Sequence, residues 1–175
     1  MEVLHQEFYG NSILNWAIAV GILILSFVVV KMLYWIFSNV IRRLTSKTKT
    51  NLDDVLIDKL EKPLTYLVLI LGYWISIHYL VFKEEVELVL ENAAYFLLVI
   101  DFTAILSRIV DALITEIIMP ISEKSDSSFD NQLIPVIQKG VRSIIWILGI
   151  IIGLDNIGFD ITAMIAGLGI GGLAL

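Results

Sequence analysis

The sequence has no cysteine, only three prolines and two histidines, and few charged residues. Without cysteine it has no disulfide and no thiolate metal site, and it gives no sign of a redox compartment. His5 and His78 are far apart in the chain and have no clustered partners, so we expect no metal site and interpret both as interfacial residues. No catalytic serine, histidine and aspartate set, phosphate loop or carboxylate pair stands out, so we expect neither an enzyme nor a cofactor.

Charged residues make up 17% of the chain and hydrophobic residues 58%. A typical soluble domain is about half apolar and about a quarter charged. The apolar excess is concentrated in long runs, which is typical of an integral membrane protein. Residues 1–11 are acidic and polar, without a basic start or a small-residue cleavage site, so we predict no cleaved signal peptide.

We find five apolar segments, at residues 13–41, 64–82, 93–119, 141–154 and from residue 162 onward. Because about 20 residues suffice to cross the hydrocarbon core, we predict an all-α membrane protein, a helical bundle of about five transmembrane spans. The first and third segments are long enough to tilt or to project beyond the membrane.

Two short amphipathic segments, residues 52–62 and 129–139, precede the second and fourth spans. Each is expected either to lie in the cytoplasmic interface or to form a solvated helical turn. Pro63 predicts a break before the second span.

The chain contains an internal repeat with an offset of 77 residues. At this offset Asp53 falls on Asp130, Lys62 on Lys139, and Gly72 on Gly149, without gaps over residues 52–75. The same offset places Lys31 on Arg108. We predict two parallel repeats of a helical hairpin, about 13–82 and 93–154; the alternative is chance similarity between apolar helices.

Lysine and arginine predict the orientation of the chain in the membrane. The two loops on one side hold nine basic residues: Arg42, Arg43, Lys47, Lys49, Lys59, Lys62, Lys124, Lys139 and Arg142. The other side holds Lys83 alone and is otherwise acidic. We therefore expect the N-terminus outside and the C-terminus toward the cytoplasm.

The third apolar segment carries a polar seam. Asp101, Ala104, Arg108, Asp111 and Thr115 are spaced by three and four residues, so they share one face of a helix. Ionisable residues inside a membrane are costly and mark either a pathway or a pair. The seam is therefore either an ion or proton route, or a set of intramembrane ion pairs among Asp101, Arg108 and Asp111, which Lys31 could join from the first repeat.

The last segment, T-A-M-I-A-G-L-G-I-G-G-L-A-L over residues 162–175, is apolar and rich in small residues. Glycine costs about 1 kcal/mol relative to alanine in a helix in water. In lipid, small residues at helical spacing let neighbouring backbones approach closely. We predict a helix that packs against copies of itself or other helices, after a turn with Gly158 at the bend and Asp160 or Thr162 as cap.

Residues 153–175 resemble the start of the pore helix in the small-conductance mechanosensitive channels. The resemblance implies that this Gly/Ala-rich helix lines the pore of a homoheptamer and that a cytoplasmic β-domain, absent from these 175 residues, follows it. It implies Leu173 as the first hydrophobic constriction residue, with Gly169 and Gly172 beside it along the pore. It further implies helix-packing positions at Ala166, Gly167, Gly171 and Ala174.

The function implied by the resemblance is a channel subunit that membrane tension opens, passing ions and small osmolytes to relieve osmotic shock. Residues 1–153 would be peripheral, tension-sensing helices and residues 154–175 the start of the pore helix. The partners implied are membrane lipids, other copies of the chain and permeating ions, with no nucleic acid, in a prokaryotic inner membrane. The alternatives are an ion- or proton-coupled transporter that uses the Asp101/Arg108/Asp111 seam, and a non-conducting scaffold whose glycine helix only dimerises.

Overall fold

A computed structural model describes residues 7–37, 39, 52–123 and 128–173. The described chain is mostly helical. Its elements, in order, are β1 (Glu7–Phe8), β2 (Asn11–Ser12), α1 (Ile13–Ile36), α3 (Leu52–His78), α4 (Glu84–Leu113), the π-helix η3 (Ile114–Ile118), α5 (Met119–Glu123), α6 (Ser128–Asn156) and α7 (Thr162–Leu173).

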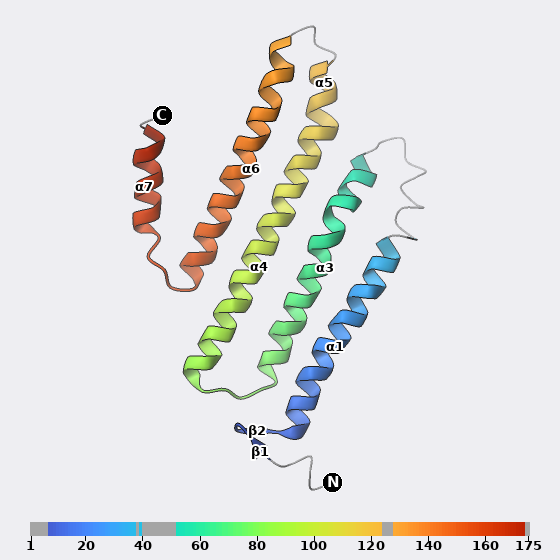
Figure 1. The fold of residues 1–175 in the computed structure, drawn as a ribbon, viewed down its shortest axis with the longest axis vertical. Helices are drawn as coiled ribbons and strands as arrows, with labels where there is room; N and C mark the ends of the chain where they lie inside the picture. The colour runs from blue at the N-terminus through green and yellow to red at the C-terminus, as the bar shows by residue number, and fades with distance from the viewer. Residues whose placement is uncertain (1–6, 38, 40–51, 124–127, 174–175) are drawn as a thin grey trace.

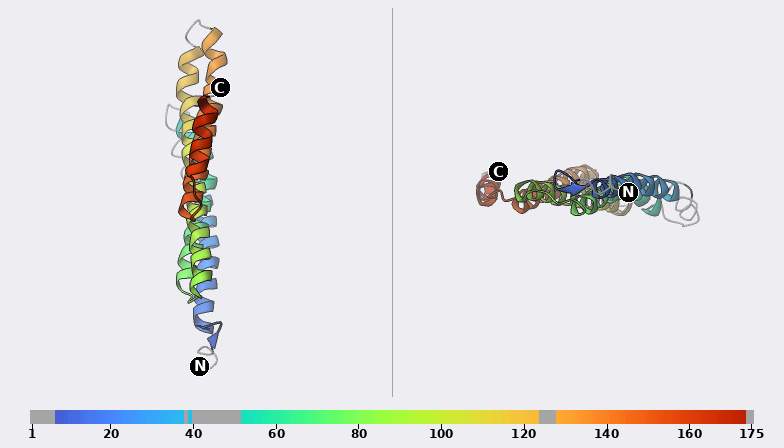
Figure 2. Two further views of the ribbon diagram at one scale, coloured as in Figure 1. Left: turned by 90° about the vertical axis from the view of Figure 1, so that its left-hand side faces the viewer. Right: turned by 90° about the horizontal axis from the view of Figure 1, so that it is seen from below.

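The long helices stand side by side in a single row (Figure 1). Each of α3, α4 and α6 packs against the long helix before it in the chain and runs in the opposite direction. Figure 2 shows that the row is one helix thick. The expected bundle is therefore wrong for the single chain. Large apolar side chains such as Leu25 and Phe27 stay exposed, which suits helices whose faces meet lipid or other chains.

Within the described residues, three helices are long and apolar enough to cross a membrane: Ile13–Ile36, Val55–His78 and Leu133–Asn156. Neither α4 nor α7, of which 12 residues are described, is among them. The expectation of about five spans therefore stays a prediction, while the apolar helices agree with an integral membrane protein.

The predicted break at Pro63 is wrong. Helix α3 runs without interruption from Leu52 to His78, with Pro63 inside it and fully buried. Helix α6 likewise contains Pro135 and continues to Asn156. The amphipathic segments at 52–62 and 129–139 are thus the first turns of α3 and α6, not separate helices in the plane of the membrane.

Small residues bring the helices together in each antiparallel pair. Between α1 and α3, a Cβ atom on Gly72 would overlap the side chain of Ser26. Between α4 and α6, a Cβ atom on Gly149 would overlap Thr103. Both hydroxyls are satisfied within their own helices, Ser26 by the carbonyl of Ile22 and Thr103 by that of Val99. Gly149, Thr103 and Val99 each lie 77 residues after the equivalent residue of the first pair, which is Gly72, Ser26 or Ile22.

A second contact in each pair obeys the same offset but exchanges large and small residues. Between α1 and α3, Ser76 donates to the carbonyl oxygen of the buried Ala19 at 2.8 Å. Between α4 and α6, the equivalent positions are Gly153 and Phe96, and a Cβ atom on Gly153 would lie 2.9 Å from the Phe96 ring. Where α1 has the small Ala19, α3 has Ser76; where α4 has the large Phe96, α6 has Gly153, which has no side chain.

The helix that contains α4, η3 and α5 continues without a break but widens at η3. Phe37 and Asn39, which lie 77 residues before Ile114 and Glu116, are π-helical as well. Such wide turns are rare in α-helices.

The turn between α6 and α7 forms as the sequence predicts. Gly158 adopts a φ of 88°, and its N–H donates to the Asp155 carbonyl while Phe159 N–H donates to that of Leu154. This is the hydrogen-bond pattern with which glycine ends many helices. The Thr162 N–H donates to Asp160 Oδ1 at 2.9 Å, so Asp160 is the residue that caps α7.

Candidate functional site

Asp101 lies on α4, the helix between α3 and α6 in the row. Its side chain is buried, with 5% of the residue exposed. Oδ2 has no hydrogen-bond partner among the described residues. A buried carboxylate without a partner is costly, so Asp101 is the member of the seam that packing alone explains least.

Arg108 donates a hydrogen bond to a backbone carbonyl that lacks its usual intrahelical donor because of Pro63. In an α-helix the N–H of residue 63 would donate to the carbonyl of Lys59, but proline has no N–H. Arg108 Nη1 on α4 donates to this Lys59 oxygen at 2.7 Å. The guanidinium thereby replaces the missing bond inside α3, which explains how Pro63 is tolerated in a continuous helix.

Asp111 joins α4 to α6 near the end of the row where α5 lies. Its Oδ1 accepts from Gln138 Nε2 at 3.2 Å, and its Oδ2 lies 3.6 Å from Arg142 Nη1. Gln138 also reaches the hydroxyl of Thr115, which donates to the Asp111 carbonyl. The Asp111 side chain is 14% exposed while that of Arg142 is 60% exposed, so the pair lies at an edge open to solvent or headgroups.

The structure does not form the predicted pairing. In the part of the chain that it describes, no ion pair within 4.0 Å joins Asp101, Arg108 and Asp111, because Arg108 binds a backbone carbonyl and Asp111 binds α6. Lys31 is exposed on α1, and α3 stands between α1 and α4. The seam therefore does not form one ion-pair network: Arg108 binds α3, Asp111 binds α6, and Asp101 Oδ2 has no hydrogen-bond partner among the described residues.

The terminal helix α7 stands at the edge of the row beside α6 (Figure 1). Its small residues Ala166, Gly167, Gly169 and Gly172 are exposed. A Cβ atom on any of these three glycines would meet no other atom within 4 Å. Ala174 lies outside the described residues, as do the surroundings of Gly171 and of the Leu173 side chain. The small-residue surface is therefore open in the single chain.

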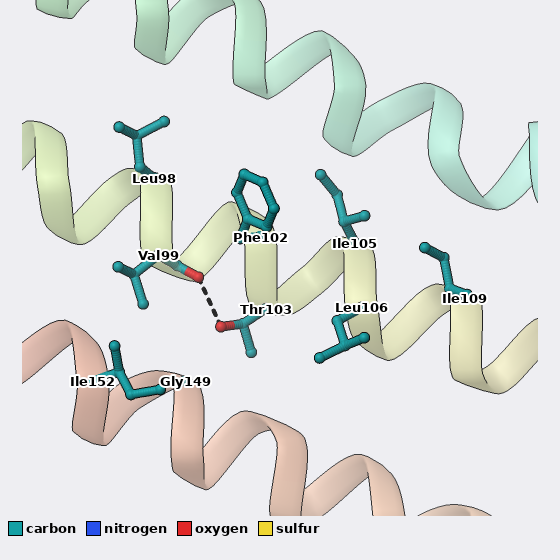
Figure 3. Close-up of a pocket in the computed structure, with 9 residues that line it drawn as sticks. All are labelled: Leu98, Val99, Phe102, Thr103, Ile105, Leu106, Ile109, Gly149 and Ile152. Carbon is teal, nitrogen blue, oxygen red and sulfur yellow. Dashed lines mark hydrogen bonds between the residues drawn. The ribbon is translucent and has the colours of Figure 1, made fainter.

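Two of the apolar grooves on the described residues involve α6. One of about 470 Å³ lies along α4 and α6, and Figure 3 shows Phe102 and Leu106 of α4 with Ile152 of α6 beside it. Thr103 is the polar residue that lines this groove. The dashed line in Figure 3 marks the hydrogen bond that its hydroxyl already donates to the Val99 carbonyl. The other groove, of about 430 Å³, lies between α6 and α7 and is lined by residues such as Ile151 and Met164. Neither groove offers polar groups that would bind a polar substrate.

His78 lies at the end of α3 and is about half exposed, in agreement with an interfacial position. Its Nδ1 lies 2.9 Å from the carbonyl oxygen of Trp74 and its Nε2 lies 3.5 Å from Glu91 Oε1 on α4. Among the described residues no three His, Cys, Asp or Glu side chains come together in a way that could hold a metal ion.

Sequence reasoning missed the partners of the seam. Gln138 and Arg142 stand at helical spacing on α6, and this spacing was the available signal for their shared contact with α4. The four-residue separation of Lys59 and Pro63 likewise identifies a carbonyl without an intrahelical donor. That Arg108 supplies the donor follows only from the packing of α4 on α3.

The terminal part of the chain matches a known family. Residues 139–175 match the family model described as "Mechanosensitive ion channel, transmembrane helices 2/3". These residues comprise most of α6, the Gly158 turn and α7. No solved structure gives a significant match to the chain.

Three curated relatives match almost the whole chain. The small-conductance mechanosensitive channel MscMJ of Methanocaldococcus jannaschii is 30% identical over 172 residues, which are 98% of this chain and 49% of the relative. The large-conductance mechanosensitive channel MscMJLR of the same organism is 25% identical, over 99% of this chain and 48% of the relative. The uncharacterized MscS family protein YhdY of Bacillus subtilis is also 25% identical, over 99% and 46%.

The chain thus spans about half the length of the curated relatives that it matches. The matches cover the peripheral helices as well as the terminal one, and they agree with the resemblance seen in residues 153–175. These matches support the small-conductance mechanosensitive channel family for this chain.

Proposed function

We propose that the chain forms the membrane part of a channel subunit that membrane tension opens, passing ions and small osmolytes during osmotic shock. The observation that carries this proposal is helix α7. It is an apolar helix with exposed small residues at the edge of the row, and it lies in the segment that matches the family model. A surface of this kind suits close contact with the same helix of neighbouring subunits.

The proposed assembly is a homo-oligomer, a heptamer by family resemblance, with α7 of each subunit around the pore. The open space next to Gly167, Gly169 and Gly172 supports packing by helices from outside the chain. The proposed location is a prokaryotic inner membrane, with the N-terminus outside and the end of α7 toward the cytoplasm. The excess of basic residues in the segments 42–62 and 120–142 supports this orientation.

The proposed gate is a ring of Leu173 side chains. A ring of apolar side chains around a narrow pore keeps it dry and so blocks ions without a plug. Gly169 and Gly172 then lie along the same helix, with Ala166, Gly167, Gly171 and Ala174 at contacts between adjacent helices. Small contacts of this kind let the helices slide or tilt with little steric resistance.

The proposed tension sensor is the remainder of the row, residues 1–153, built as two copies of one hairpin. The two glycine–hydroxyl contacts and the paired size exchange at the 77-residue offset support the duplication. Tension favours the state with the larger in-plane area, and a flat row of helices exposes much of its surface to the lipid that transmits that tension.

A coupled transporter remains the alternative, and one observation favours it. Asp101 is buried within the row and its Oδ2 has no partner among the described residues, as expected for a group that binds a proton or cation in transit. This alternative predicts substrate-dependent flux that Asp101→Asn abolishes and that does not depend on tension.

Patch-clamp recording from liposomes that contain the complete protein tests the proposal. We expect stepwise conductance that rises with suction, and a resting leak in Leu173→Ser because a hydroxyl ring wets the constriction. Tension-gated currents with an unchanged resting state in Leu173→Ser would place the gate elsewhere. Silence up to membrane rupture would reject the channel and make Asp101→Asn flux the next measurement.

A further inference from the structure

The chain begins its described part with a small hairpin that the helical pattern did not predict. Strands β1 and β2 pair antiparallel, with Glu7 opposite Ser12 and Phe8 opposite Asn11. Tyr9 and Gly10 form the turn, both with positive φ, 52° and 77°. A tyrosine rarely adopts this conformation, and such strain persists only where the surroundings enforce it.

The surroundings that enforce it centre on Asn11. This side chain is 2% exposed and is one of the largest fully buried side chains. Its Nδ2 donates to the carbonyl of Val81 at 2.7 Å, and its Oδ1 accepts from the Val81 N–H at 2.6 Å. One amide therefore satisfies both backbone groups of a residue 70 positions away, in the turn between α3 and α4.

Trp16 adds a second tie between the same parts. Its Nε1 donates to the Phe8 carbonyl at 3.0 Å, and its ring meets that of Phe82 edge-on, 6.4 Å between centroids. The hairpin is thus fixed both to the start of α1 and to the α3–α4 turn, as its place at that end of the row in Figure 1 illustrates.

The hairpin presents its aromatic residues outward. Phe8 is 60% exposed and Tyr9 is 83% exposed, and their rings meet edge to face at 4.6 Å. Helix α1, which is long and apolar enough to cross a membrane, starts at Ile13, directly after the hairpin. Its 24 residues are about 36 Å long, slightly more than a hydrocarbon core of about 30 Å. If α1 spans a membrane, the two rings therefore lie at the level of the membrane–water boundary.

We propose that the hairpin is an interfacial anchor: Phe8 and Tyr9 insert between the phospholipid headgroups of the leaflet next to the α3–α4 turn, and Asn11 transmits the position of that anchor to the turn. Tyrosine, which has an apolar ring and a polar tip, favours this boundary, and the Phe8 ring adds apolar surface beside it. The hairpin leads directly into α1, whose apolar side chains such as Leu25 and Phe27 are exposed, so we take lipid as the partner and a second protein as an outcome of the test. This inference requires that the protein spans a membrane and does not depend on tension gating.

A depth measurement tests the anchor. Because the 175 residues contain no cysteine, a spin label on Tyr9→Cys reports one position in phosphatidylcholine–phosphatidylglycerol vesicles. Phe27→Cys on the exposed side of α1 is the lipid control and Glu85→Cys at the start of α4 is the water control. Phe8→Cys repeats the test without altering the strained turn position.

We expect collisions with an aqueous nickel chelate to be several-fold rarer at position 9 than at position 85, and collisions with oxygen to fall between the two controls. Chelate access equal to that at position 85 would place the rings in water and overturn the anchor. Shielding from both reagents would indicate a protein contact and would overturn it equally.

A distance measurement tests the role of Asn11. Labels on Tyr9→Cys and Glu85→Cys report the separation of the hairpin from the α3–α4 end. We expect a narrow distance distribution that broadens in Asn11→Ala. Asn156→Ala is the matched control, since the Asn156 amide donates to Ile152 within its own helix. An unchanged distribution in Asn11→Ala, or equal broadening in the control, would refute the transmission from Asn11 to the turn.

Discussion

At the scale of single residues, the pairing of Arg108 with the Pro63 gap makes an energetic prediction. Arg108→Met removes the donor to Lys59 and should cost about 1.5–3 kcal/mol of unfolding free energy, the usual range for a hydrogen bond to a charged group. In a Pro63→Ala background the alanine N–H supplies that bond, so the same substitution should cost much less. Thermal unfolding of the four variants in lipid measures the coupling.

Arg142→Met is the matched control for this cycle, because its guanidinium pairs with the Asp111 side chain and not with a backbone carbonyl. Its cost should be the same in the natural protein and in the Pro63→Ala background. A loss in Arg108→Met that is equally large in both backgrounds would show that Arg108 acts through its charge and not through the Lys59 carbonyl.

The Asp160 cap predicts a dependence on pH at the start of α7. The Thr162 side chain and then its N–H donate to Asp160, and these bonds hold the pKa of this exposed carboxyl below its ordinary value of 3.8. Because the folded-state pKa is lowered, the cap stabilises α7 above pH 3.8 and is lost as the pH falls through the lower folded value.

Residue-resolved hydrogen exchange in the first turn of α7 measures this effect. After correction for intrinsic exchange, protection should be constant from neutral pH down to the ordinary carboxyl value and should fall below it. Asp160→Asn keeps an acceptor oxygen that does not titrate, so its protection should not fall in acid. Protection that falls alike in both proteins would assign the change to another group.

At the scale of the helices, the Ala19–Ser76 contact and its equivalent, Phe96–Gly153, allow a test of the duplication. Ala19→Phe should overpack the α1–α3 contact at about 1–3 kcal/mol, since Ala19 is buried. Adding Ser76→Gly recreates the Phe96–Gly153 arrangement of the α4–α6 pair and should recover part of this loss. Unfolding of the single and double variants gives the coupling energy.

Leu25→Phe, on the exposed side of α1, is the control for the added ring and should change stability little. If Ser76→Gly fails to reduce the cost of Ala19→Phe, the two hairpins do not share one packing arrangement. The 77-residue offset would then be a similarity of sequence alone.

At the scale of the whole molecule, the flat row predicts sensitivity to bilayer thickness. Helix α1, about 36 Å long, slightly exceeds a hydrocarbon core of about 30 Å, and tilting is one way in which it can fit. If tension opens the complete protein, vesicles of shorter-chain phospholipid should lower the tension needed, because a thinner bilayer already favours the tilted, expanded state. Patch-clamp thresholds in two lipids that differ only in chain length measure the shift.

A threshold that is the same in both lipids would separate gating from the tilt of the row. The Asn11→Ala variant, recorded in the same pair of lipids, indicates whether the hairpin contributes to any shift that is seen. Its resting conductance serves as the check that the assembly is intact.

The sequence by itself determined the membrane class, most helices, the Gly158 turn and the family resemblance, and it narrowed the cap of α7 to Asp160 or Thr162. Each of these depends on composition or on residues close together in the chain, which are read directly from spacing. The 77-residue offset also placed Gly72 and Gly149 at equivalent positions, and both form close contacts with a hydroxyl-bearing residue of the neighbouring helix.

Only the tertiary structure decided which partner each polar group takes. Arg108 binds the Lys59 carbonyl, Asp111 binds α6 and Asn11 binds Val81, all across gaps of 27 to 70 residues that no local pattern encodes. The row replaced the expected bundle for the same reason. In lipid, apolar surface does not drive helices together, so the few small and polar contacts, not the hydrophobic pattern, decide which helices are neighbours.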